Sequence, residues 1–256
     1  MSLVEVHKHL YVYQEEINDG ILKQFPVAPK GFRPTVLDVG CGSGALSEAI
    51  ASRGYTVWGI EQDAGAAKSA AERNIRIVKA DLTQVSEASA AINGQMFDYL
   101  VFSDVLEHLY DPFYILREYL KFLKTGGILM ISVPNAVVWS NRIAFLIGRF
   151  NYSDTGVMDR THLRFFTFKS AKELIRHAGC DIVRVDYTPF LVRAALPLVK
   201  KMFDRGQSGA QPRTRQIIDS TAYKCYTKYV YPIEYALGWL WKSLFAFRII
   251  IIAQKK

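Results

Sequence analysis

Val36-Leu-Asp-Val-Gly-Cys-Gly-Ser-Gly44 is the stretch that decides the fold of this chain. Its first four residues are apolar except for Asp38 and predict a buried strand that ends at a glycine-rich turn. The apolar residues within 45–50 recur at helical spacing and predict a helix after the turn. A strand, a glycine turn and a helix begin an open α/β sheet, in which ligands bind at the carboxyl ends of the strands. Glycine allows a positive φ there and lets the backbone approach a ligand closely.

A second acid follows the glycines at a distance that indicates a nucleoside ligand. Tyr55-Thr-Val-Trp-Gly-Ile-Glu61 predicts a strand that ends in a carboxylate, about twenty residues after the turn, where such an acid binds a ribose diol. The glycines follow the pattern G-x-G-x-G and differ from the dinucleotide pattern G-x-G-x-x-G. Asp38 would meet the pyrophosphate of a dinucleotide, so it favours a ligand with a cationic end. S-adenosylmethionine, which carries an ammonium and a sulfonium, is such a ligand.

Several segments resemble, in order, the motifs of class I S-adenosylmethionine-dependent methyltransferases. The resembling segments are 36–44, 79–82, 97–109 and 123–135. A further segment, Asp159-Arg-Thr-His-Leu-Arg-Phe-Phe-Thr167, resembles bacterial members related to ubiquinone-type O-methyltransferases.

The resemblance implies which residues bind the cofactor. Glu61 occupies the position of the ribose-binding acid, and Asp81 that of the acid that meets the adenine amino group. The residues expected to bind S-adenosylmethionine are Asp38, Gly40, Cys41, Gly42, Gly44, Glu61, Gln62, Asp81, Leu82 and Ser103. An acid at a strand end also caps turns, so a structural role for Asp81 stays open.

Two histidines are candidates for the catalytic base. Alignment of nucleophile, methyl group and sulfur can supply on the order of 7–11 kcal/mol, and an oxygen nucleophile also needs a base, most often histidine. His108 follows the fourth expected strand and His162 lies in the loop after the fifth. We expect His162 to act as base or substrate orienter, with Glu107 and His108 shaping the pocket. A helix start for His108 and a lid anchor for His162 are the structural alternatives. The other histidines are interpreted as structural or surface residues: His7, His9 and His177.

No metal site is expected, because acids do not cluster with histidine at ligand spacing along the sequence. Arg160 and Arg164 could clamp an anionic substrate or pair with Asp154 and Asp159.

The alternation of strand and helix patterns predicts an α/β fold. We expect a doubly wound, mostly parallel seven-stranded sheet of the Rossmann-like methyltransferase type, with helical insertions after strands 5 and 6. The expected strands are 36–39, 55–61, 75–81, 97–103, 128–133, 181–188 and 247–253. Residues 1–256 are expected to form one domain, with a cap helix and linker at 1–34, a lid at 136–167 and a second helical insertion at 189–244.

Charge is distributed unevenly along the 256 residues, which carry a net charge of +8. Residues 1–135 hold 12 basic and 16 acidic side chains, whereas residues 136–256 hold 20 and 8. Such asymmetry suggests an anionic partner: a phosphate, a nucleotide, a nucleic acid or lipid headgroups. An ordinary solvated surface is the alternative. A content of 50% hydrophobic residues excludes a disordered chain.

A cytoplasmic location is expected. The start of the chain lacks the apolar run of a signal peptide, and three widely spaced cysteines favour a reducing compartment: Cys41, Cys180 and Cys225. Lys242 and Arg248 interrupt the apolar run 236–253, so no transmembrane span is expected. Association in the plane of a membrane, through helices at 191–203 and 226–241, stays open.

The favoured function is methylation by S-adenosylmethionine of an oxygen on a small or carrier-linked acceptor, such as a saccharide, a lipid or a quinone-like compound. A nucleic-acid or N-methyltransferase that uses the basic C-terminal half is one alternative. Against nucleic acid, the fourth strand ends in Ser-Asp-Val-Leu-Glu rather than Asn/Asp-Pro-Pro-aromatic. A non-catalytic scaffold that binds the cofactor is the other alternative, which the complete set of acids disfavours. The acceptor and the oligomeric state stay open.

Overall fold

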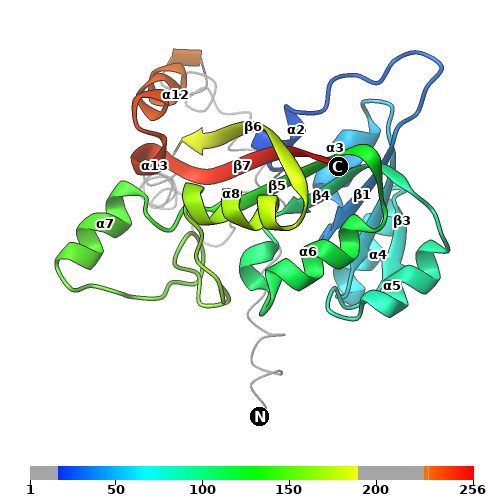
Figure 1. Cartoon of the computed structure of the whole chain (residues 1–256), viewed down its shortest axis with the longest axis horizontal. Coiled ribbons are helices and arrows are strands. Elements are labelled where there is room, and N and C mark those ends of the chain that lie inside the picture. The colour runs from blue at the N-terminus through cyan, green and yellow to red at the C-terminus, as the bar shows by residue number, and fades with distance from the viewer. Residues whose placement is uncertain (1–16, 190–227, 230) are drawn as a thin grey trace, which may run out of the picture. The chain divides into compact units, whose positions relative to one another are not determined.

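A computed structural model describes residues 17–189, 228–229 and 231–256 (Figure 1). One sheet contains seven strands in the order β3-β2-β1-β4-β5-β7-β6. The strands are β1 (Thr35–Val39), β2 (Thr56–Glu61), β3 (Arg76–Lys79), β4 (Phe97–Ser103), β5 (Leu123–Pro134), β6 (Cys180–Pro189) and β7 (Ala246–Lys255). Strands β1 to β5 pair in parallel, and Figure 1 shows β6 and β7 running in opposite directions.

Helices cover both faces of this sheet. The helical elements of the described residues are α2 (Asp19–Leu22), α3 (Ala45–Ala51), α4 (Ala64–Glu72), α5 (Val85–Ile92), the 3₁₀ turn η1 (Leu106–His108), α6 (Pro112–Leu120), α7 (Trp139–Leu146), α8 (Phe168–His177), α12 (Tyr231–Leu240) and α13 (Lys242–Phe245). On one face, Ile92, Leu116 and Ile175 bring α5, α6 and α8 into the core. On the other, Ile21 and Ile50 of α2 and α3 pack against alternate strand residues. The predicted doubly wound α/β sheet is therefore confirmed.

The chain forms two compact units. The core unit comprises Met1–Ala136, Asn151–Asp186 and Ile249–Lys256, and the insert unit comprises Val137–Phe150 and Tyr187–Arg248. Residues 137–150 of the expected lid and the whole expected second insertion at 189–244 thus belong to the same unit. Residues 151–167, which the sequence groups with the first insertion, lie in the core unit. The domain boundaries derived from the sequence stay a prediction.

Strand β5 differs from its expected form because of a glycine pair. The sequence predicts a turn at Gly126 and Gly127 and a strand only after it, whereas β5 begins at Leu123. The pairing with β4 shifts register here, since Phe97 faces Leu123 and Tyr99 faces Ile128. Gly126 has a φ of +75°, which glycine adopts without strain. The glycines therefore form an irregularity within the strand and do not separate it from the preceding helix.

Other expected segments are shorter, or lie outside the described part of the chain. Of the expected N-terminal helix, the structure describes only α2. Within the expected lid at 136–167, the helix is confined to α7 and is followed by Gly148 at a φ of +72°, as in a glycine-terminated helix. His7, His9, Cys225 and the expected helix at 191–203 lie outside the described residues. Within the described ranges, every helix is too short or too polar to cross a bilayer.

Candidate active site

The centre of the sheet brings the predicted site residues to one edge. Strands β1 and β4 are neighbours, and the chain order reverses between them. Ligands of open α/β sheets bind at the carboxyl ends of the strands beside such a reversal. Asp38 lies next to the end of β1, Glu61 ends β2 and Ser103 ends β4. The switch point is therefore the candidate ligand site.

Asp38 is buried, and one of its two carboxylate oxygens accepts a hydrogen bond from the described residues. Its side chain is 1% exposed, and Oδ2 accepts a hydrogen bond from Ser47 Oγ at 2.6 Å. Oδ1 is buried and receives no hydrogen bond from the described residues. Burial raises the pKa of Asp38 to about 6, the Ser47 hydrogen bond opposes this, and nearby Glu61 adds to it. A buried acceptor without a donor costs roughly 1–3 kcal/mol, so this oxygen fits a ligand ammonium such as that of S-adenosylmethionine.

Glu61 is bound to the backbone on both carboxylate oxygens. Oε2 accepts from the Gly42 amide at 3.0 Å and Oε1 from the Asp63 amide at 2.8 Å. These bonds hold the 4%-exposed carboxylate against the glycine turn. Each oxygen has a second lone pair, so the group fits the hydroxyls of a ribose.

The glycine turn is tight enough to require glycine. Gly40 and Gly44 have φ values of +75° and +81°. A Cβ on Gly40 would lie 2.7 Å from Val105 Cγ2, and one on Gly44 would lie 2.8 Å from Ala70 Cβ. Burial raises the pKa of the Cys41 thiol between them, so this cysteine is not a nucleophile at neutral pH.

Three further predicted cofactor residues, Gln62, Asp81 and Leu82, follow the ends of β2 and β3. Asp81 is exposed, and its Oδ1 accepts from the amide and the hydroxyl of Thr83, both at 2.8 Å. Leu82 is half-buried beside Gly40, and Gln62 is exposed. The turn-capping alternative for Asp81 is thus observed, and its contact with an adenine stays a prediction.

A buried polar network at the carboxyl ends of β4 and β5 joins Ser103, a predicted cofactor residue, to Asn18 and Ser132, which the sequence analysis missed. Asn18, which is 4% exposed and caps α2, donates from Nδ2 to Ser132 Oγ at 2.8 Å and to Ser103 Oγ at 3.1 Å. Ser132 Oγ donates to Asp104 Oδ1 at 2.9 Å and accepts from the Asp104 amide at 3.0 Å. Asp104 has a φ of +55°, which is uncommon outside glycine. The network fixes this carboxylate at the exit of β4.

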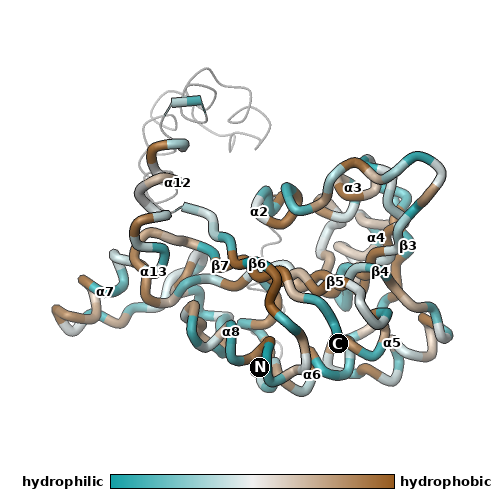
Figure 2. Tube along the Cα trace, turned by 45° about the horizontal axis from the view of Figure 1, so that its top comes forward, coloured by the Kyte–Doolittle hydropathy of each residue, from teal (hydrophilic) through white to brown (hydrophobic). Residues whose placement is uncertain are grey.

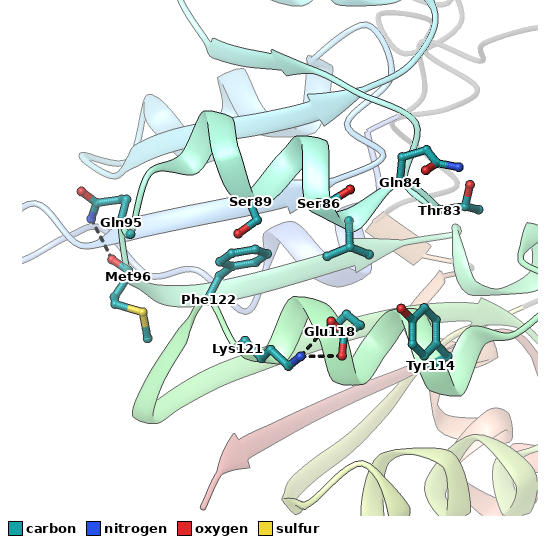
Figure 3. Close-up of a pocket in the computed structure, with 12 residues that line it drawn as sticks. Thr83, Gln84, Ser86, Ser89, Gln95, Met96, Tyr114, Glu118, Lys121 and Phe122 are labelled. Carbon is teal, nitrogen blue, oxygen red and sulfur yellow. Dashed lines mark hydrogen bonds and ion pairs between the residues drawn. The ribbon is translucent and has the colours of Figure 1, made fainter.

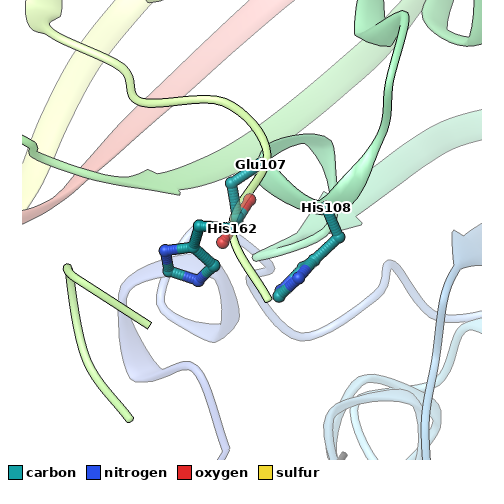
Figure 4. Close-up of side chains that lie close together, drawn as sticks. All are labelled: Glu107, His108 and His162. Carbon is teal, nitrogen blue, oxygen red and sulfur yellow. The ribbon is translucent and has the colours of Figure 1, made fainter. Parts of the chain in front are cut away.

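His108 and His162 lie together beyond that exit (Figure 4). Their ring centroids are 4.8 Å apart. Nδ1 of His108 is 3.2 Å from the Thr161 carbonyl, and Nδ1 of His162 is 3.0 Å from the Val157 carbonyl. Because a carbonyl only accepts hydrogen bonds, we assign the ring proton to Nδ1 in each, which leaves Nε2 as the basic nitrogen.

Burial favours the neutral form of both imidazoles. Burial, with a smaller effect from His162, lowers the pKa of His108 to about 4. Burial also lowers the pKa of His162, against the opposing effects of the Val157 carbonyl and of Asp159 and Asp104. A pair of neutral imidazoles can accept a proton from a bound hydroxyl.

Glu107 joins the two histidines in a compact cluster. Its side chain is 1% exposed, and its backbone carbonyl accepts from the amides of Leu163 and Arg164 at 2.8 and 2.9 Å. Ligand atoms of Glu107, His108 and His162 all lie within 4.8 Å of one another. The premise that no acid clusters with histidine is therefore wrong, because the loop that carries His162 folds back onto η1. Two imidazoles and a carboxylate could hold a divalent transition metal. The expected lack of a metal stays a prediction.

The two arginines of the loop make surface contacts. Arg160 pairs with Asp154 at 2.8 Å, and Arg164 donates from Nε to the Tyr110 carbonyl at 2.9 Å. The alternative of pairing with Asp154 is thus observed for Arg160, whereas Arg164 contacts a backbone carbonyl and neither of the two expected acids.

A groove between α5 and α6 lies apart from these residues (Figure 3). It has a volume of about 560 Å³, and Ser89, Tyr114 and Phe122 are among its lining residues. None of the predicted site residues lines it, so it takes no part in the site.

Fold and site together define a class I S-adenosylmethionine-dependent methyltransferase. A family model described as a methyltransferase domain matches residues 9–185. The chain belongs to this methyltransferase domain family. The predictions of the family and of S-adenosylmethionine as its cofactor are therefore confirmed.

Individual proteins show how far the likeness extends. The ubiquinone biosynthesis O-methyltransferase of Psychrobacter arcticus is 32% identical over 167 residues, which are 62% of this chain and 64% of that protein. The chain thus spans less than two thirds of this curated relative. A SAM-dependent methyltransferase from Archaeoglobus fulgidus superposes with a TM-score of 0.58 at 20% identity, over 99% of this chain and 100% of that one. Phosphoethanolamine N-methyltransferase 2 of Haemonchus contortus, solved with S-adenosyl-L-methionine, superposes with a TM-score of 0.56 at 17% identity, over 93% of this chain and 52% of that one. At these identities the structures show a shared fold.

Proposed function

We propose that this chain transfers the methyl group of S-adenosylmethionine to a hydroxyl oxygen of a small or carrier-linked acceptor, such as a saccharide, a lipid or a quinone-like compound. One observation carries the proposal. A neutral imidazole pair lies at the carboxyl end of β4, the neighbour of the strand that carries Asp38.

The donor side of the proposed site is formed by Asp38 and Glu61. S-adenosylmethionine supplies an electrophilic methyl group on its sulfonium. Oδ1 of Asp38 would accept from the ammonium, which holds the carboxylate ionised. Glu61 would accept from the ribose hydroxyls, because its backbone bonds fix both oxygens. The closely packed Gly40 and Gly44 would keep the turn open to the adenosine.

The acceptor side is formed by His162, His108 and Glu107. Nε2 of His162 would take the proton of the acceptor hydroxyl as the oxygen attacks the methyl group. The Val157 carbonyl would then stabilise the resulting imidazolium through Nδ1–H. His108 and Glu107 shape the pocket, and Glu107 anchors the loop of His162 through its carbonyl. General-base catalysis of this kind contributes about 10²–10⁴-fold.

The name of the Psychrobacter relative supports an oxygen as the acceptor atom. The proposal includes a cytoplasmic location, which the widely spaced cysteines support.

Mass spectrometry of reactions with an acceptor panel tests the proposal. The full chain and S-adenosylmethionine are incubated with ortho-dihydroxyaromatic compounds that carry an apolar chain, with saccharides, with primary amines and with an oligonucleotide. Of the acceptors in the panel, only compounds with a hydroxyl group are expected to react, and each such reaction should yield a methyl ether and S-adenosylhomocysteine. Methylation confined to amines or the oligonucleotide would contradict the proposal. Donor binding by calorimetry without turnover of any acceptor would favour a scaffold protein.

A further inference from the structure

Helix α7 of the insert unit is apolar but has no buried residue. Leu146 is 87% exposed and Ile147 60%. We call the exposed apolar residues at its C-terminal end the α7 tip: Ile143, Phe145, Leu146, Ile147 and Phe150. The rings of Phe145 and Phe150 stack with centroids 5.3 Å apart. Figure 2 shows the apolar colouring at the end of α7. A contiguous exposed apolar patch marks an interaction surface.

The α7 tip is presented by an anchored helix. Arg142 donates from Nε to the Val137 carbonyl at 2.6 Å and from Nη2 to Ser243 Oγ at 3.3 Å. The bond to Ser243 attaches α7 to the N-terminal part of α13 within the insert unit. The tip therefore needs no refolding to meet a partner.

The charge of the insert unit indicates which partner this is. Its residues include 12 basic and 3 acidic side chains, whereas the rest of the chain has 20 and 21. The segment 137–150 contains Arg142 and Arg149 and no acid. A strongly positive unit repels a second copy of itself and attracts an anionic surface. A nucleic acid would use the charge but not the aliphatic side chains. An anionic bilayer uses both.

A second exposed segment of the same unit has the composition of a membrane interface. Trp239, Leu240 and Trp241 at the end of α12 are exposed, and Lys242 follows them. Tryptophan and lysine are enriched where a protein meets the headgroup level of a bilayer. Since no described helix can cross a bilayer, contact in the interface plane is the arrangement that fits.

We propose that the insert unit docks on an anionic lipid bilayer, with the α7 tip inserted at the boundary of headgroups and acyl chains and Arg149 at the lipid phosphates. The α12 end, Trp239 to Trp241, makes a second contact. This inference does not depend on methyl transfer, because it concerns surface residues outside the proposed active site.

Vesicle co-sedimentation of the full chain tests the docking. Vesicles of phosphatidylcholine are compared with vesicles of an equal mixture of phosphatidylcholine and phosphatidylglycerol. Wild-type protein is expected to bind the mixed vesicles at least about tenfold more strongly. Leu146→Glu, which places a charge in the α7 tip, is expected to lower binding to the mixed vesicles by about tenfold or more. Arg149→Gln is expected to weaken binding a few-fold, on the mixed vesicles only.

Val27→Glu serves as the matched control, because Val27 is an apolar residue of the core unit that is 79% exposed. This substitution is expected to leave binding to the vesicles unchanged. Circular dichroism and donor calorimetry establish that each variant folds. Equal binding to both vesicles, or full binding by Leu146→Glu, would overturn the proposal. A different result would also overturn it: wild-type protein that does not bind either vesicle and that forms a dimer in sedimentation equilibrium. In that case Leu146→Glu would dissociate the dimer, and the α7 tip would be an interface between copies of the chain.

Discussion

The carboxyl ends of β1 and β4 are neighbours in the sheet, but their polar groups are assembled in different ways. At β1, Asp38 accepts a hydrogen bond from Ser47, which lies nine residues further along the chain. At β4, His108 contacts Thr161, which lies 53 residues away. The surroundings of Asp38 are therefore built within a single strand–turn–helix unit. Those of His108 exist only after a distant loop has folded back.

The two ends also differ in how burial changes their ionisation. Burial raises the pKa of the acid Asp38 and lowers that of the base His108. Each group is shifted toward its neutral form, as expected for removal from water. In the proposed mechanism, Asp38 would regain a counter-charge from a ligand ammonium, whereas His162 would stay neutral until it accepts a proton. The predictions below test this division of roles.

The largest effect is expected from His162→Ala. Loss of the base should lower kcat by about 10²–10⁴-fold, with the dissociation constant of S-adenosylmethionine unchanged. Single-turnover kinetics and calorimetry measure the two quantities. His177→Ala is the matched control, because His177 is exposed at the end of α8. A mutant with normal turnover would remove His162 from the mechanism.

Acid should change stability in opposite directions at the two ends. Between pH 6.5 and about 4 the unfolded chain binds a proton at His108 more readily than the folded one, so the free energy of unfolding falls as the pH falls. Between about 6 and 3.8 the folded chain binds a proton at Asp38 more readily, so the free energy of unfolding rises as the pH falls. Each contribution is about 3 kcal/mol, and the two largely offset each other in the wild type.

Urea unfolding at a series of pH values separates these contributions. Relative to wild type, Asp38→Asn should lose more stability on acidification, and His108→Gln should lose less or gain. Parallel pH profiles for both variants and the wild type would contradict the opposite ionisation shifts.

Asp38→Asn should weaken donor binding by roughly tenfold to a hundredfold, since a charge-assisted hydrogen bond contributes about 1.5–3 kcal/mol. Its acceptor KM should stay near the wild-type value, because the substitution lies on the donor side. Calorimetry with S-adenosylmethionine and S-adenosylhomocysteine measures the change. Equal affinity in mutant and wild type would show that Oδ1 does not meet the ammonium.

Asn18→Ala should lower kcat by about tenfold, because Ser132 loses a buried donor and Asp104 is held less firmly. Asn18→Asp should be more damaging, although it is nearly isosteric, because it puts a carboxylate beside Asp104. The affinity for S-adenosylmethionine should be unchanged in both variants. If kcat were lower for Asn18→Ala than for Asn18→Asp, a negative charge in this network would not be what lowers kcat.

The smallest effect is expected from Asp81→Asn. Its carboxylate is exposed and already bound to Thr83, and exposed polar contacts contribute little. The donor dissociation constant should rise by no more than about threefold. A rise comparable to that of Asp38→Asn would instead assign Asp81 a dominant contact with the adenine.

Much of the fold was predictable because its signals are local. The predicted strand at 97–103 matches β4 in its bounds, since apolar patterning and flanking turns mark both ends. The start of β5 was not predictable from the glycine pair. Glycine in a turn and glycine in a strand irregularity look the same in sequence, and only pairing with β4 distinguishes them.

The candidate site divides in the same way. The acids Asp38 and Glu61 could be found because both lie at a characteristic sequence distance from the glycine turn, Asp38 just before it and Glu61 about twenty residues after it. Asn18 and Ser132 could not be found, because their hydrogen bond joins residues 114 positions apart. Only the packing of α2 against the carboxyl ends of the strands makes that contact.

The unsatisfied oxygen of Asp38 has a calorimetric consequence. With a pKa of about 6, about half of the ligand-free molecules carry a proton on this group at pH 6. A ligand ammonium would favour the ionised carboxylate, so capture of the donor would expel that proton into solution. The observed heat should then vary with the ionisation enthalpy of the buffer at pH 6, and this dependence should weaken as the pH is raised toward 7.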